Sequence, residues 1–561
     1  MRVVVAVVDV ADGGPSDALH LELSSAPAGT GVRYETLLRN DLDGPVRLDG
    51  VRFQLDARPT QVLEHGWQSW STVRRAAVSD LRPVRAEAPA WFRAEMLANS
   101  AAPGRVLSGD TFLVTDAGVA GFLAGRHQFG TIEVKPDGAV EARLLLDGVV
   151  LQSGATLELE PLWCTDAPAG PAYTEFVELS ASEATASGSP PRASSRALLG
   201  WCSWYQYWNW VRPDDIRANL AFAIEFAIDL VQIDDGWQRS IGEWTETNDD
   251  WGEPISKLAE EISAAGCTPG LWTAPFIVLE GGAVATAHPD WLARDDLGRA
   301  LRAQPNPLWG GWTSALDTTN PEVLEHLRAT YRTLREAGFS YHKIDFCFAA
   351  ALPGQRVGDG TMTRAEALRA GLEAVREGLG DDAFLLACGC PLSPALGVVD
   401  AMRVSEDVAP YWDTRAFFEG FEESSVSARN AIEASVLRVP LHRRWWINDP
   451  DCLLLRPSDT QLTDDEREAL TMAILGAGAF VVVSDELRGY GTAEWEVLAQ
   501  LERWRRDADQ PRDLRDPFAT PVMVAGVPDL WIDWDARTAT IGLSEEAWEA
   551  GRGASAGDAS A

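Results

Sequence analysis

Eight short apolar runs between residues 199 and 486 are the feature that most restricts how this chain can fold. Longer stretches with helical periodicity separate many of them, for example 213–227, 254–266 and 363–380. This alternation is typical of a parallel sheet whose strands are buried on both faces. Eight repeats match a (β/α)8 TIM barrel, which we predict for residues 198–505. In chain order the runs are LGWCSW, DLVQIDD, TPGLWTA, YHKIDF, FLLACG, AMRVSED, WWINDPD and FVVVSDE.

A doubly wound parallel sheet would fit the same alternation, and it too places its site at the carboxyl ends of the strands. However, no GxGxxG or GxxxxGK(S/T) string follows an early run. The usual nucleotide-binding interpretation is therefore excluded, and the barrel is favoured.

The regions on either side of the runs read differently. Residues 1–190 contain alternating segments such as VRLDGVRFQLDA, separated by Gly, Pro and Asp, which predict an antiparallel sandwich. A stretch rich in Ser, Ala and Pro near 182–197 predicts a linker. Residues 506–548 predict a small β module, and 549–561 a disordered tail. The chain is thus expected to be multidomain, α/β in its centre and β at both ends.

The charge balance restricts the partners. The chain has 84 Asp and Glu against 48 Lys and Arg, a formal charge of −36. Such a surface repels phosphate backbones and anionic membranes, so neither nucleic acid nor membrane is expected as a partner, and a neutral substrate fits better. No window approaches the ~20 apolar residues of a membrane span. The opening residues MRVVVAVVDV predict a strand rather than a signal peptide, which favours a cytoplasmic protein.

Seven cysteines without CxxC spacing are expected to be buried, reduced thiols. Structural zinc is not expected, and the sequence predicts no metal and no cofactor.

Acidic residues stand at or near the carboxyl ends of five of the eight apolar runs. In a barrel these ends meet at one face, so the side chains would converge although they are far apart in the sequence. A single Asp in this place often only caps a loop or helix, and clustered carboxylates can also bind Mg²⁺ or Ca²⁺. Lys343 beside the cluster and the scarcity of His near it disfavour a metal. The acids are Asp234, Asp235, Asp345, Asp407, Asp449, Asp451 and Asp485.

Glycoside hydrolysis needs two carboxyl groups, one ionised to attack the anomeric carbon and one protonated to donate to the leaving oxygen. Lys343, two residues before Asp345 on the same strand face, favours the ionised form of Asp345. Glu406 next to Asp407 would raise its pKa toward that of a general acid, whereas Arg403 would lower it, so the direction stays open. Trp residues repeat beside these acids, and indole rings suit the apolar faces of sugars.

Six strings in order resemble glycoside hydrolase family 36 and, more distantly, family 27. The EHGWQSWS segment extends the resemblance over essentially the whole chain. The strings are GWCSWYQYW, QIDDGWQ, HKIDF, CGCPL, MRVSEDVAPYW and WINDPDCLL. The resemblance implies an N-terminal β-supersandwich, the central barrel and a C-terminal β-sandwich.

The resemblance also implies roles for individual residues. Asp345 matches the nucleophile and Asp407 the acid/base of a retaining double displacement. Further positions match the substrate contacts: Asp234 and Asp235 for the O4 and O6 hydroxyls, Lys343 for O3 and O4, Arg403 for O2, Trp67 or Trp70 as a wall of the sugar pocket, and Trp204, Tyr205, Trp272 and Cys388 as further contacts. Two places differ from the family pattern: CGCPLSP replaces a Gly-rich segment, and Ser405 and Glu406 replace a Gly-Pro pair.

The expected function is therefore that of a retaining exo-α-galactosidase acting on galactosides and raffinose-type oligosaccharides. An α-N-acetylgalactosaminidase, an α-glucosidase or a transglycosylase stays open within the class. A carbohydrate-binding barrel without catalysis is the alternative from another class. Because the strands of Asp345 and Asp407 should have one strand between them, we expect their carboxyl groups to lie ~6 Å apart. The aglycone and the oligomeric state stay open.

Overall fold

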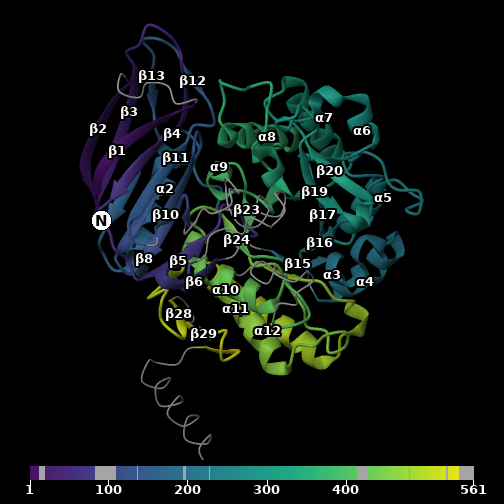
Figure 1. Cartoon of the computed structure of the whole chain (residues 1–561). Coiled ribbons are helices and arrows are strands. Elements are labelled where there is room, and N and C mark those ends of the chain that lie inside the picture. The colour runs from purple at the N-terminus through teal and green to yellow at the C-terminus, as the bar shows by residue number, and fades with distance from the viewer. Residues whose placement is uncertain are drawn as a thin grey trace, which may run out of the picture.

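The computed structural model describes residues 1–11, 19–71, 73–81, 109–135, 137–193, 198–226, 228–413, 426–478, 480–525 and 529–541. An N-terminal β region stands beside a central α/β unit, and a small C-terminal sheet lies next to the last helices of that unit (Figure 1). The disordered tail expected at 549–561 lies outside the described residues.

The N-terminal region is one large, almost wholly antiparallel sheet of 14 strands within the described residues. The segments at 46–57 and 139–152 form neighbouring strands in it, as their alternating pattern predicted. Their inward side chains, such as Leu48, Phe53 and Leu144, are buried in the core of this region. The strands are β1 (Val3–Val10), β2 (Leu19–Ala28), β3 (Gly31–Asn40), β4 (Val46–Leu55), β5 (Gln61–His65), β6 (Val73–Ala77), β7 (Gly109–Asp110), β8 (Phe112–Thr115), β9 (Gly118–Phe122), β10 (Phe129–Val134), β11 (Val140–Leu145), β12 (Val150–Leu151), β13 (Thr156–Glu158) and β14 (Leu162–Thr165).

A helix that the sequence pattern did not predict follows this sheet: α2 (Ala169–Ala186). It reaches into the segment expected to be a linker, of which 194–197 lies outside the described residues. Phe176 of α2 packs against Phe112 of β8 with ring centroids 5.1 Å apart and against Trp445 of the central unit at 6.4 Å. The helix thus joins the N-terminal sheet to the central unit.

The central unit is built on a parallel sheet, and all eight apolar runs form strands in it. The strands pair in the order β24-β23-β22-β21-β17-β16-β15-β26-β25. Its two edge segments, β24 and β25, are consecutive in the chain, with Pro450 and Asp451 between them. The strands are β15 (Leu199–Cys202), β16 (Leu230–Ile233), β17 (Thr268–Thr273), β21 (Tyr341–Ile344), β22 (Phe384–Ala387), β23 (Ala401–Arg403), β24 (Ile447–Asp449), β25 (Cys452–Leu453) and β26 (Val481–Val483).

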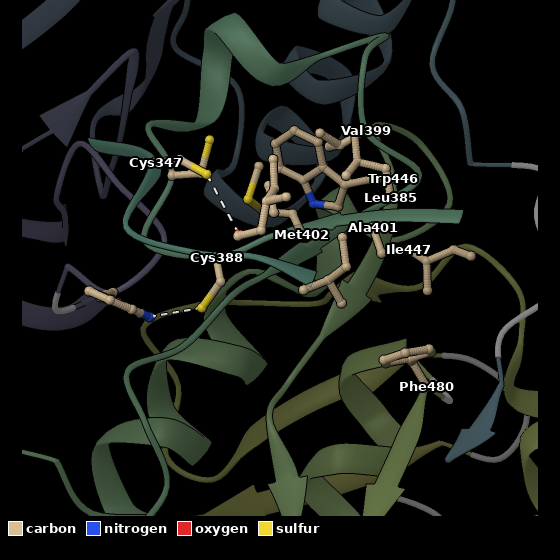
Figure 2. Close-up of a cluster of buried hydrophobic side chains, with 14 of the residues drawn as sticks. Cys347, Leu385, Cys388, Val399, Ala401, Met402, Trp446, Ile447 and Phe480 are labelled. Carbon is tan, nitrogen blue, oxygen red and sulfur yellow. Dashed lines mark hydrogen bonds between the residues drawn. The ribbon is translucent and has the colours of Figure 1, made fainter. Parts of the chain in front are cut away.

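Helices connect these strands, and a dense apolar core lies against them. Figure 2 shows part of this core, in which Leu385, Ala401 and Ile447 come from three neighbouring strands. The predicted helix at 363–380 begins with a capping box in which Thr363 and Glu366 bond to each other's backbone. The helices are α3 (Trp204–Tyr207), α4 (Pro213–Glu225), α5 (Ile255–Ala264), α6 (Ala283–Ala287), α7 (Pro321–Glu336), α8 (Arg364–Leu379), α9 (Leu392–Ala395), α10 (Ala428–Leu437), α11 (Asp464–Gly478) and α12 (Thr492–Ala508).

Two smaller sheets complete the fold. A three-stranded antiparallel sheet inserted after β17 consists of β18 (Ile277–Leu279), β19 (Arg302–Asn306) and β20 (Gly311–Ala315), and the sequence did not predict it. The C-terminal strands form one antiparallel sheet on α11, where Leu530 and Ile532 lie over Gly476. The described residues thus show a single C-terminal sheet, where the resemblance implied a sandwich. These strands are β27 (Asp513–Leu514), β28 (Val522–Ala525), β29 (Leu530–Asp533) and β30 (Thr538–Ile541).

Candidate active site

Several of the side chains predicted to form the site lie at the carboxyl ends of the parallel strands. Asp345 directly follows β21, and Asp407 comes four residues after the end of β23. β22 pairs with both of these strands, so one strand lies between them, as predicted. Because all these strands are parallel, their carboxyl ends lie along one edge of the sheet.

Two N–H donors hold the Asp345 carboxylate. Nε1 of Trp272, on β17, donates to Oδ2 at 3.0 Å, and the backbone N of Phe346 donates to Oδ1 at 2.8 Å. Phe346 has φ 54°, a left-handed conformation that a non-glycine residue seldom adopts and that is common at functional sites. Asp345 and Trp272 are both buried. Both carboxylate oxygens are therefore fixed in direction.

Lys343 does not contact Asp345 most closely, although the sequence pattern suggested that pair. Its Nζ donates to Oδ2 of Asp234, after β16, at 3.0 Å. Burial is the largest single effect and lowers the pKa of Lys343, but the negative charges around it, Asp234 foremost and then Asp345, together hold that pKa well above its usual value. Lys343 and Asp234 thus form a buried ion pair, which places a hydrogen-bond donor next to an acceptor.

Asp235 lies beside this pair, and an indole from the turn between β19 and β20 completes its surroundings. Nε1 of Trp309 donates to its Oδ2 at 2.8 Å, and Nε2 of Gln238 donates to its Oδ1 at 2.6 Å. Burial raises the pKa of Asp235 to about 6, with these two bonds acting in the opposite direction. Trp309 had no predicted role. The only signal for it was the LWGGW string, which follows no strand of the parallel sheet.

Arg403 at the end of β23 is the cationic centre of the other half of the site. Its Nη1 lies 2.9 Å from Oδ1 of Asp407. Its Nε lies 3.3 Å from Oδ2 of Asp449, and its Nη2 lies 2.7 Å from Oδ1 of Asp451. Arg403 is 2% exposed, so three carboxylates surround a guanidinium that water hardly reaches.

The direction of the Asp407 pKa, left open by the sequence, is upward. Burial and then the charge of Asp451 raise the pKa of Asp407 to about 6, against the lowering effect of Arg403. The neighbouring negative charge that matters most is thus Asp451, and the sequence pattern had pointed to Glu406. The Asp407 side chain is 36% exposed, which leaves it accessible to a ligand.

The N-terminal sheet contributes one loop to the site, residues 65–71. Nε1 of Trp70 donates to Sγ of Cys388, which is labelled in Figure 2, at 3.1 Å. The ring of Trp70 lies edge-on to Phe346, with centroids 4.9 Å apart. The backbone N of Ser69 donates to the Cys390 carbonyl oxygen at 2.9 Å. Trp67, the other candidate for the pocket wall, packs instead against Phe129 of β10. Trp70 is therefore the Trp of this loop that reaches the site.

A buried arginine holds this loop. Nη1 of Arg438 donates to the carbonyl oxygens of Ser69 at 2.7 Å and Val404 at 3.0 Å, and Nη2 donates to that of Gln68 at 3.2 Å. Val404 follows β23, so one side chain binds both the loop of the N-terminal sheet and the strand that leads to Asp407.

Three further residues that the sequence singled out make contacts apart from the pairs described above. The hydroxyl of Tyr205 donates to Oδ2 of Asp451. Trp204 packs against Trp208, with ring centroids 5.1 Å apart. Asp485, one of the strand-end acids, accepts bonds from the Tyr490 hydroxyl and from two backbone N–H groups, and so stabilises a loop.

Other kinds of site find little support in the described residues. They contain no group of three or more His, Cys, Asp or Glu side chains placed to hold a metal ion. The helices described there are all too short or too polar to cross a bilayer. The seven cysteines are buried and form no disulfide.

The site thus contains two carboxyl groups whose strands have one strand between them. Asp345 accepts bonds from two N–H donors, and Asp407 has a raised pKa. Such a pair suits a glycoside hydrolase, which needs two carboxyl groups with different roles.

Comparison with known proteins gives the same class. Residues 200–370 match the family model described as Melibiase. The chain is 33% identical over 149 residues to the α-galactosidase AgaA of Geobacillus stearothermophilus, which is 24% of this chain and 19% of that protein. It is 30% identical over 79 residues to the bifunctional α-galactosidase/sucrose kinase AgaSK of Mediterraneibacter gnavus, 13% of this chain and 8% of that protein. The matched stretches therefore span about a fifth or less of these relatives.

Solved structures match over much more of the chain. TtGalA, an α-galactosidase from Thermus thermophilus in complex with p-nitrophenyl α-D-galactopyranoside, superposes with a TM-score of 0.71 at 27% identity, over 92% of this chain and 97% of that one. The family 36 α-galactosidase AgaA from G. stearothermophilus gives a TM-score of 0.62 at 15% identity, over 91% of this chain and 72% of that one, which is a likeness of fold. The resemblance to glycoside hydrolase family 36 is confirmed, and the relatives and solved structures named above are α-galactosidases.

Proposed function

We propose that this chain is a retaining exo-α-galactosidase in which Asp345 is the nucleophile and Asp407 the acid/base. The observation that carries the proposal is the contrast between two carboxyl groups, that of Asp345 directly after β21 and that of Asp407 four residues after β23. Asp345 accepts two N–H bonds that favour a carboxylate, whereas Asp407 has a raised pKa and an accessible side chain. The first step of a double displacement requires a carboxylate that attacks and a carboxylic acid that gives up its proton, and the proposal assigns these roles to Asp345 and Asp407.

In the first step an oxygen of Asp345 attacks the anomeric carbon, and the bond from that carbon to the leaving oxygen breaks. Asp407 gives its proton to the leaving oxygen, so the aglycone departs as a neutral alcohol. In the second step Asp407 takes a proton from water, the water oxygen attacks the anomeric carbon, and Asp345 is released. Two inversions give net retention of the α configuration.

The remaining polar groups suit the hydroxyls of one terminal sugar. Asp234, Asp235 and Lys343 supply acceptors and a donor close together, and charge-assisted bonds of this kind contribute about 1.5–3 kcal/mol each. Trp70 and Phe346, which pack edge-on against each other, add apolar ring surface next to Cys388 and Asp345. We propose that this pocket binds the galactosyl group, with the roles at O2, O3, O4 and O6 that the family resemblance implies.

The substrates proposed are α-galactosides, including raffinose-type oligosaccharides. TtGalA, at 28% identity, has been solved in complex with stachyose. We further propose that the parallel sheet is a (β/α)8 barrel closed through Pro450 and Asp451, within residues 198–505, flanked by β domains at 1–190 and 506–548. A cytoplasmic location, consistent with seven free cysteines, belongs to the same proposal.

A parallel assay of chromogenic α-galactoside, α-N-acetylgalactosaminide and α-glucoside tests the proposal. The expected result is a kcat/KM at least tenfold higher for the galactoside. Preference for either other sugar would move the assignment to that relative. Binding of galactose without turnover of any of the three would favour the carbohydrate-binding barrel. Transfer of the glycosyl group to an added sugar, in preference to water, would indicate a transglycosylase.

A further inference from the structure

Asp451, between β24 and β25, makes contacts to three other parts of the site, and nothing so far assigns it a role. Its Oδ1 pairs with Nη2 of Arg403 at 2.7 Å. Its Oδ2 accepts the Tyr205 hydroxyl and the backbone N–H of Val408, the latter at 2.7 Å. Asp451 is 1% exposed and has φ 76°, so both its charge and its backbone conformation cost free energy that these contacts must offset.

The bond to Val408 is significant because Val408 directly follows Asp407. It fixes the backbone on the far side of the acid/base residue, while Arg403 contacts the Asp407 carboxyl itself at 2.9 Å. Asp451 therefore touches both neighbours of the Asp407 carboxyl, the guanidinium and the following amide. The negative charge of Asp451 also offsets part of the effect of Arg403 on Asp407, because Arg403 pairs with both carboxyl groups.

We propose that Asp451 is a positioning residue for the acid/base. It anchors the backbone after Asp407, and it binds the Arg403 guanidinium, which without Asp451 would stabilise the ionised form of Asp407 more strongly. The inference rests on the proposed function, since it gives a task to a residue that acts through Asp407. The direction of the Asp407 pKa agrees with it, because Asp451 is the largest charge effect raising that pKa.

Other charged groups act on Asp407 from the neighbouring elements, and the experiment has to separate them from Asp451. Arg403 and Lys343 favour the ionised form of Asp407, while Asp345 opposes it. Asp449, the last residue of β24, shares Arg403 at 3.3 Å and is the matched control, since it is a buried carboxylate two residues from Asp451 that lacks the bond to Val408.

The test is the pH dependence of kcat/KM for Asp451→Asn, with a poor alcohol leaving group. Asn keeps the shape, can accept the Val408 N–H and tolerates a positive φ, but it carries no charge. The basic limb, where Asp407 loses its proton, should move down by roughly one pH unit, so that turnover above the limb falls about tenfold. Asp451→Glu, which restores the charge at a displaced position, should return the limb toward its original pH while kcat stays low.

Two further comparisons complete the design. Asp449→Asn should move the limb by less than half as much. With a dinitrophenyl leaving group, which departs without a proton, the Asp451→Asn defect at high pH should shrink. Asp451→Ser serves as a second neutral variant in case Asp451→Asn does not fold, as judged by thermal unfolding.

The inference would be overturned if a folded neutral variant kept the basic limb at the original pH, or if Asp449→Asn moved it as far. These outcomes differ from failure of the proposed function, in which the unsubstituted protein would hydrolyse none of the glycosides and no limb could be measured.

Discussion

Nε1 of Trp272 donates a hydrogen bond to Oδ2 of Asp345 across 3.0 Å, from the strand next to the one that carries the acid. Removing this donor should leave the carboxylate held by the Phe346 N–H alone. Trp272→Phe is expected to lower kcat/KM by roughly 10- to 100-fold, since a hydrogen bond to a charged group contributes about 1.5–3 kcal/mol. Trp244→Phe is the matched control, because Trp244 is equally buried and packs on Trp272 without touching Asp345. Equal losses in both variants would mean that packing, and not the hydrogen bond, matters.

Replacement of Asp345 itself tests its role as nucleophile. Asp345→Ala should lower turnover by several orders of magnitude while the protein stays folded, because the covalent step is lost. Azide or formate should partly restore turnover of an activated α-galactoside, since a small anion can enter the space left by the carboxylate. The azide adduct should have the β configuration. An adduct of α configuration would contradict the assignment.

The pKa of Asp407 predicts where activity declines with rising pH. A general acid must be protonated, and burial together with Asp451 raises the pKa of Asp407 to about 6. A plot of log(kcat/KM) should therefore bend downward at a pH of about 6 and fall on the alkaline side. Asp235 titrates in the same range, so the assignment needs a second substrate. If the limb belongs to Asp407, it should flatten with a dinitrophenyl galactoside; a limb unchanged by the leaving group would point to Asp235.

Asp235 should reduce the stability of the folded protein at neutral pH. Its pKa is raised to about 6 by burial, above its ordinary value near 3.8, so between these values the folded state binds more protons than the unfolded state. The free energy of unfolding should then fall as the pH rises through this window. The free energy of unfolding of Asp235→Asn, taken relative to that of the unsubstituted protein, should therefore increase from pH 4 to pH 7, by on the order of 2 kcal/mol.

Urea unfolding of both proteins at several pH values measures this difference, in which contributions common to both cancel. The same variant should lose galactosidase activity, a trade between stability and function that active sites often show. A stability difference that does not change with pH would show that the Asp235 carboxyl keeps its ordinary titration in the folded protein.

The strands of the central unit could be predicted because each is a short apolar run, and because five of the eight runs carry an acidic residue at or near their carboxyl end. Both features can be read from consecutive residues. The helix α2 could not, because Ala and Ser dominate its second half and leave no clear periodicity. β19, the strand that leads toward Trp309, lies outside the β/α alternation, so the contact of Trp309 with Asp235 had no local signal.

Pairings between distant segments were also beyond the sequence. The pattern identified Lys343, Arg403 and the strand-end acids, but not which acid each cation contacts. Lys343 pairs with Asp234 because parallel strands bring their ends together in space, an arrangement that spacing along one strand cannot reveal. In the same way, Arg438 binds the loop that carries Trp70 through backbone carbonyl oxygens, which every sequence contains.

The stereochemistry of hydrolysis tests the central claim most directly, because it depends on how the two carboxyl groups act and not on which sugar is preferred. Retaining enzymes hold their carboxyl groups ~5–5.5 Å apart and inverting ones ~6.5–9.5 Å apart. The ~6 Å expected for Asp345 and Asp407, one strand apart, is close to the retaining range. Proton NMR in the first minutes of hydrolysis, before mutarotation, shows which anomer forms first. The account predicts α-galactose from an α-galactoside, and β-galactose as the first product would contradict both the double displacement and the assignment of Asp345 as nucleophile.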